Sequence, residues 1–100
     1  MAGTRKNTKK TVKPGKDLIE STIEKLQARL VKTIGQDIEE LVIDMKGVNN
    51  VDSTGLGLLI AANNSLDQAG GHFSLTNVPE KMENLLRMIG LDKYFSVNAA

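Results

Sequence analysis

The chain has 100 residues, of which 13 are Lys or Arg and 12 are Asp or Glu, so its formal net charge at pH 7 is +1. It contains no cysteine and a single histidine, which excludes disulfides, cysteine nucleophiles and metal sites built from thiolates or several imidazoles. The length predicts a single domain, and 40% apolar residues are enough to give it a core. No apolar run reaches the ~18 residues of a membrane span and the N-terminus has no apolar signal core, so we expect a cytoplasmic protein without membrane contacts.

The charge is distributed unevenly along the chain. Residues 1–16 carry six basic side chains and no acidic one. The other seven basic residues and all 12 acidic residues lie in 17–100, where the net charge is therefore −5. A basic arm on an acidic body is a pattern of nucleic-acid-binding proteins, but this arm lacks the aromatic residues that stack on bases. We therefore expect residues 1–13 to be a flexible segment, with a short edge strand at about 10–13, and no direct binding of nucleic acid.

Helical and extended patterns alternate after this segment. The spacing of Ile19, Ile23, Leu26 and Leu30 predicts a helix over about residues 18–33. Residues 40–45 are short, apolar and β-branched, which predicts a buried strand.

The second half of the chain continues the alternation. Helical spacing predicts a helix from Thr54 or Gly55 to Gln68, and residues 72–78 alternate as a strand does. Pro79 suits the first position of a last helix that ends at Gly90, after which a short apolar tail packs back or pairs as a strand. The order of these elements predicts an α/β fold with a small open sheet covered by helices.

Residues 52–57, Asp-Ser-Thr-Gly-Leu-Gly, stand where a strand gives way to a helix. Asp and Ser are favoured N-cap residues, and such a cap contributes ~1 kcal/mol. Two glycines in the first turn each cost ~1 kcal/mol relative to alanine, which a cap alone does not explain. The glycines either let the helix start pass close to a strand, or they admit a partner. The free N–H groups and the positive end of the helix dipole would also stabilise a phosphate on Ser53 or Thr54.

Other chemistries fit this segment less well. No lysine follows the glycines as in a P-loop, and no third glycine completes a dinucleotide fingerprint. A Ser–His hydrolase would need His72 beside Ser53, and the GxSxG elbow is missing. Asp44 and Asp52 offer oxygens to a divalent cation, but backbone donors at the strand end satisfy Asp44 more simply. We expect no catalytic residue, no metal and no cofactor.

The chain resembles a STAS domain, the fold of bacterial anti-sigma factor antagonists, over about residues 14–97. The family shows a strand ending in D(L/M)xxVxxxDSxGLxxL, then a helix, two glycines before a strand, and a final helix followed by GLDKxF. This sequence has DMKGVNNVDSTGLGLL, GGHFSLTNV and IGLDKYF. It departs from the family at its start, where the usual apolar first strand is replaced by a basic segment with Val12 as its one large apolar residue.

The resemblance implies a mixed β-sheet of about four strands with helices mainly on one side. It also implies a non-catalytic partner-switching regulator of transcription. An anti-sigma factor with serine kinase activity would bind the unmodified form and phosphorylate Ser53, and a serine phosphatase would reverse the modification. The implied partner-binding residues are Asp52, Ser53, Thr54, Gly55, Leu56 and Gly57, beside an apolar surface that could include Leu56, Met82 or Met88. The alternative is a STAS scaffold subunit of a lipid-transport or stress-sensing complex that binds without phosphorylation.

Overall fold

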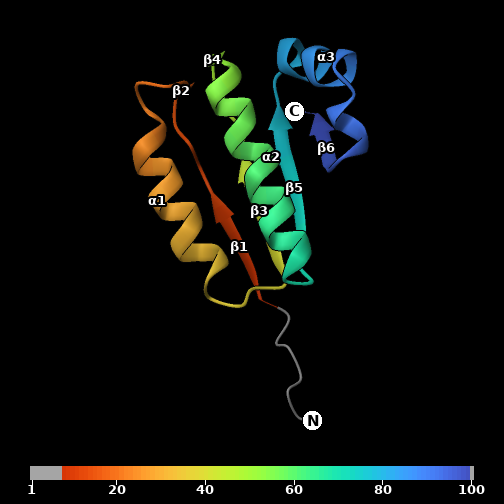
Figure 1. Ribbon diagram of the computed structural model, residues 1–100. Helices are drawn as coiled ribbons and strands as arrows, with labels where there is room; N and C mark the ends of the chain where they lie inside the picture. The colour runs from red at the N-terminus through yellow and green to blue at the C-terminus, as the bar shows by residue number, and fades with distance from the viewer. Residues whose placement is uncertain (1–7, 100) are drawn as a thin grey trace.

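Strands and helices alternate along residues 8–99, the part of the chain that the computed structural model describes (Figure 1). The elements in chain order are β1 (Lys9–Val12), β2 (Asp17–Leu18), α1 (Ile23–Ile34), β3 (Glu40–Asp44), β4 (Asn50–Val51), α2 (Ser53–Gln68), β5 (His72–Val78), α3 (Glu80–Met88), a 3-10 turn (Leu91–Lys93) and β6 (Ser96–Ala99). The short strand expected at about 10–13 corresponds to β1. Most of the basic arm, residues 1–7, lies outside the described residues, so its expected flexibility stays a prediction.

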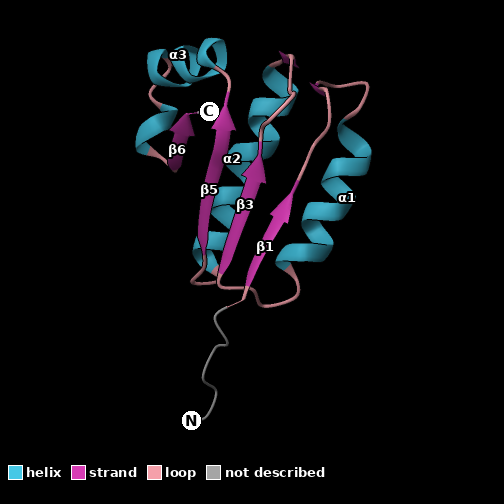
Figure 2. Cartoon of the chain, turned by 180° about the vertical axis from the view of Figure 1, so that it is seen from behind, coloured by secondary structure: helices cyan, strands magenta, loops and turns pink. Residues whose placement is uncertain are grey.

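The main sheet has four strands in the order β1-β3-β5-β6, and all of its pairings are parallel. Helices α1 and α2 cover one face, and Figure 2 shows the sheet from the opposite face with these helices behind it. The predicted α/β class is confirmed. The resemblance implied a mixed sheet, whereas the described strands are all parallel, because a helix between successive strands of the sheet returns the chain to the same end.

A second, two-stranded sheet extends the first at the carboxyl end of β1 and β3. Strand β2 pairs with β4 in parallel, with Leu18 opposite Val51. This pairing corrects the predicted start of the first helix at about residue 18. Ile19 has the spacing of the helix face, but it lies in the turn after β2, because Leu18 before it pairs with β4. Helix α1 therefore begins only at Ile23.

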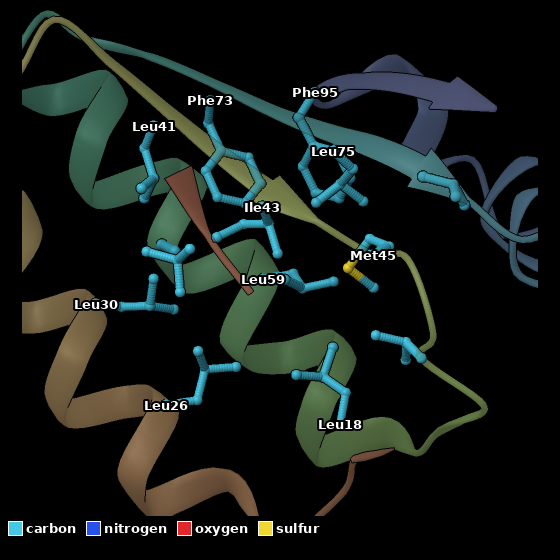
Figure 3. Packing of buried hydrophobic residues seen from close by; sticks show 14 of the residues in the cluster. Leu18, Leu26, Leu30, Leu41, Ile43, Met45, Leu59, Phe73, Leu75 and Phe95 are labelled. Atoms are coloured by element: carbon cyan, nitrogen blue, oxygen red, sulfur yellow. The ribbon is translucent and has the colours of Figure 1, made fainter. Parts of the chain in front are cut away.

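The core lies between the sheet and the two helices. Alternate residues of β3 and β5 point at the helices, and all are at most 2% exposed: Leu41, Ile43, Phe73 and Leu75. Figure 3 shows Leu26 and Leu30 of α1 and Leu59 of α2 packing toward these side chains. Burial of each such side chain stabilises the fold by ~1.5–3 kcal/mol. Because Leu18 belongs to the same cluster, the core also fixes β2 beside the start of α2.

Candidate functional site

The start of α2 is capped by Asp52, and Ser53 is the first residue of the helix. The Gly55 N–H donates to Asp52 Oδ1 at 2.9 Å, and the Leu56 N–H donates to the Asp52 carbonyl oxygen at 3.0 Å. Ser53 and Thr54 are both exposed. Since Asp52 does the capping, the Ser53 hydroxyl is not used as the helix cap and lies at the surface, at the positive end of the helix dipole.

The Asp52 carboxylate makes a second bond to a distant part of the chain. Its Oδ2 accepts the Glu20 N–H at 2.9 Å, across 32 positions of sequence. Glu20 lies in the turn at residues 19–22, which the Thr22 N–H closes on the Ile19 carbonyl oxygen. The Glu20 and Gly55 N–H groups hold the pKa of Asp52 below its ordinary value, because both stabilise the charged form. Asp52 thus joins this turn to the start of α2.

The two glycines of the segment have different environments. A Cβ on Gly55 would overlap the Leu18 carbonyl oxygen and would lie 2.9 Å from Leu18 Cγ. Gly55 is therefore required by the fold, since α2 begins against the backbone of β2. Gly57 is exposed, and a Cβ added there would meet no atom within 4 Å. The fold explains the first glycine and leaves the second on the open surface beside Ser53.

Two hollows adjoin the residues that lead into α2. One, of 540 Å3, has acidic walls and is lined by Ile19, Glu20, Ser21, Glu24 and Asp52. The other, of 140 Å3, lies between β4 and α3 and is lined by Asn49, Val51, Lys81, Met82 and Leu85. The surface beside Ser53 is therefore acidic at one hollow and partly apolar at the other.

The apolar residues expected near Ser53 differ in exposure. Leu56 is half-buried against the core, and Met82 is 6% exposed in the wall of the smaller hollow. Met88, at the end of α3, is 81% exposed. The sequence pattern did not show that Val51 and Leu85 line the smaller hollow, or that the turn at 19–22 lines the larger one. Each of these placements depends on contacts between distant segments. Gly55 was the one available sign that another segment lies against the start of α2, since a glycine in a first helical turn implies a close neighbour.

Comparison with known proteins identifies the family. The profile of the STAS domain matches residues 3–100, nearly the whole chain. The chain belongs to the STAS domain family. The match confirms the resemblance seen in the sequence motifs, and it extends into the basic arm.

Individual relatives of this STAS domain include an anti-sigma-B factor antagonist of Staphylococcus epidermidis, which is 29% identical over 87 residues, covering 87% of this chain and 81% of the relative. The fold matches the NMR structure of the Thermotoga maritima protein TM1081 with a TM-score of 0.78 at 21% identity, covering 90% of this chain and 73% of that one. It also matches the Bacillus cell fate determinant SpoIIAA in its phosphorylated form, with a TM-score of 0.68 at 18% identity, covering 97% and 87%. At these identities the two structures establish the fold alone.

The other candidates from the sequence lie apart from Ser53 in the STAS domain. His72 follows the C-terminal end of α2, so the 16-residue helix separates it from Ser53 by roughly 24 Å at 1.5 Å per residue. Its Nε2 lies 3.5 Å from the Ser96 hydroxyl. Asp44 Oδ1 accepts the Lys46 N–H and the Asn77 side-chain amide, each at 3.0 Å.

These placements test the alternatives considered for the sequence. The separation of His72 from Ser53 rules out a Ser–His pair. Asp44 accepts one backbone donor, the Lys46 N–H, as its position at a strand end predicted, and one donor that was not predicted, the side-chain amide of Asn77 in β5. Within residues 8–99, no group of three or more His, Asp or Glu side chains is arranged to hold a metal ion, and no helix of that part is long and apolar enough to cross a membrane.

The hydrogen bonds to Asp52 predict a loss of stability in acid. Because the folded chain lowers the pKa of Asp52, its contribution is present at neutral pH and disappears as the pH falls below about 4, through the lowered pKa. In Asp52→Asn, this part of the pH dependence should be missing. Urea unfolding measured from pH 7 to pH 2.5 should show a shallower decline for the variant than for the unsubstituted chain. Parallel curves would contradict the assignment.

Proposed function

We propose that this STAS domain is an anti-sigma factor antagonist that works by partner switching. In the unmodified form it binds an anti-sigma factor with serine kinase activity. A phosphate on Ser53 ends this binding, and a serine phosphatase restores it. The observation that carries the proposal is the exposed Ser53 hydroxyl at the first position of a helix that Asp52 already caps. The name of the staphylococcal relative and the phosphorylated form of SpoIIAA support it.

The chemistry of such a switch requires only an acceptor hydroxyl from this chain. The kinase transfers the γ-phosphoryl group of ATP to Ser53 Oγ, ADP leaves, and the hydroxyl proton passes to a base of the kinase. The phosphatase hydrolyses the phosphate ester with water and releases inorganic phosphate. We therefore propose that the protein is not itself an enzyme and that it acts in the cytoplasm, where ATP and sigma factors are found.

The site also accounts for the effect of the phosphate. The group adds about −1.5 to −2 charges at pH 7, and the positive end of α2 tolerates this charge. The neighbouring wall already carries Glu20, Glu24 and Asp52. A surface that binds the kinase in its unmodified form thus gains a strong negative field at its centre, which changes the partner it can bind.

Phosphorylation by a kinase tests the proposal directly. Incubation with ATP and the anti-sigma factor kinase of the same genome should add one phosphate to the unsubstituted chain, detected by intact mass. Ser53→Ala should accept none, because its methyl group offers no nucleophile. Thr54→Ala is the matched control, since Thr54 is exposed in the same helical turn, and it should still accept one phosphate. Phosphate on Ser53→Ala would refute the site.

A further inference from the structure

The family resemblance implied a partner-binding role for Asp52, but its carboxylate is used within the chain. One oxygen accepts the Gly55 N–H and the other accepts the Glu20 N–H, both at 2.9 Å. We propose that Asp52 is a positioning residue for the reaction at Ser53, holding the turn at residues 19–22 against the start of α2 so that both meet the kinase as one surface. The inference rests on the proposed function and specifies how the site is organised.

The attachments of the turn support this role. Strand β2 is held by its pairing with β4, and the Asp52 N–H donates to the Leu18 carbonyl oxygen at 3.2 Å. Beyond Leu18, the Thr22 hydroxyl donates to the Ile19 carbonyl oxygen within the turn at 3.1 Å, and to the Asp17 carbonyl oxygen of β2 at 2.9 Å. The Glu20 N–H to Asp52 bond joins this locally closed turn to α2. The core and the pairing of β2 hold the turn near the start of α2, and the Asp52 carboxylate holds the Glu20 backbone against that start.

The same residue fixes the acceptor hydroxyl. Ser53 directly follows Asp52, and the Gly55 bond sets where the first turn of α2 begins. Phosphoryl transfer depends almost entirely on positioning of the acceptor, because the protein contributes little covalent chemistry. Asp52 thus has two separable effects, one on the helix start through Gly55 and one on the turn through Glu20.

The variant Asp52→Asn separates these effects. Asparagine retains one acceptor oxygen and caps a helix as well as aspartate does, so the bond to Gly55 is kept. Its amide nitrogen cannot accept the Glu20 N–H. We expect the KM of the kinase for the chain to rise about tenfold, the size of one lost hydrogen bond to a charged group, with kcat within about twofold. Hydrogen exchange of the Glu20 amide in the free chain should quicken, and exchange of the Gly55 amide should not.

Asp52→Ala removes both bonds and gives a graded comparison. This variant loses the helix cap at Gly55 as well as the bond to the Glu20 N–H. We therefore expect kcat to fall and KM to rise. Asp44→Asn is the control for loss of a carboxylate charge, because Lys46 and Asn77 both donate to Asp44 Oδ1, an oxygen that asparagine retains. Asp44 is not among the residues that line either hollow beside α2, and it pairs with Thr76. Because side chains alternate along a strand and the neighbouring Ile43 points into the core, Asp44 lies on the opposite face of the sheet. We expect Asp44→Asn to leave both kinetic constants unchanged.

The outcomes distinguish this inference from the proposed function. Equal kcat and KM for the unsubstituted chain and Asp52→Asn would overturn the positioning role and leave phosphorylation of Ser53 intact. Unchanged exchange of the Glu20 amide in Asp52→Asn would overturn it too. If the unsubstituted chain accepts no phosphate at all, the proposed function fails, and the positioning role fails with it. A rise in KM with a quicker Glu20 exchange, absent in Asp44→Asn, supports it.

Discussion

Replacing Gly55 by alanine is expected to destabilise the fold, whereas the same replacement at Gly57 is expected to stabilise it. The new Cβ at position 55 overlaps the Leu18 carbonyl oxygen, and that backbone cannot easily move. Leu18 is paired with β4, and its side chain is 1% exposed in the core. Overpacking of this kind costs ~1–3 kcal/mol or more, which exceeds the ~1 kcal/mol that alanine returns in helix propensity.

Gly57 is the matched control for this experiment, since it lies in the same helix and has no neighbour within 4 Å. Alanine there should raise the free energy of unfolding by up to ~1 kcal/mol, because it only gains helix propensity. Thermal unfolding should separate the two variants clearly, at about 4–8 °C per kcal/mol for a domain of this size. Similar melting temperatures would show that α2 does not begin against Leu18.

The Gly57 variant also tests why a second glycine is present. If Gly57→Ala is more stable than the unsubstituted chain but binds the anti-sigma factor kinase more weakly, the glycine serves close approach of the partner. If binding is unchanged, the exposed surface at Gly57 has no such role. Stability and binding must be measured on the same preparation, because a destabilised variant would weaken binding for an unrelated reason.

Elements that depend on local patterns could be predicted from the sequence. The alternation in residues 72–78 matches β5 residue for residue, and the cap chemistry at 52–53 placed the start of α2 within two residues. The α/β class followed from the order of these elements. In each case the information lies within one turn or one strand, where side-chain period and capping residues decide the backbone conformation.

Features that depend on contacts between distant segments could not be predicted in this way. The sequence predicts a helix from about residue 18, yet Leu18 pairs with Val51, 33 positions away, and is a strand residue. The spacing of Asp52 and Ser53 indicated both a cap and a site, but not that Asp52 also binds the turn at 19–22. The sequence therefore indicated Ser53 as the proposed acceptor, but it did not indicate the turn at residues 19–22 that Asp52 holds beside the start of α2.

A negative charge at position 53 is expected to weaken binding of the anti-sigma factor kinase by ten- to a hundredfold, because like charges forced together at an interface cost several kcal/mol. The variant is Ser53→Asp, which imitates part of the charge of a phosphate. Aspartate at the first position of a helix is favourable by ~0.3–1 kcal/mol, so the loss will not reflect unfolding. Titration calorimetry with the kinase, without ATP, measures the dissociation constant of each variant.

Ser53→Asn is the decisive control, since asparagine has the shape of aspartate without its charge. If charge acts as proposed, Ser53→Asn keeps most of the affinity, and the loss in Ser53→Asp shrinks at 1 M salt, where the Debye length is about 3 Å. If both variants bind weakly, the small serine side chain is needed for fit, and the switch is steric. If both bind as the unsubstituted chain does, position 53 lies outside the interface. That result would favour a STAS scaffold that binds its partner without phosphorylation.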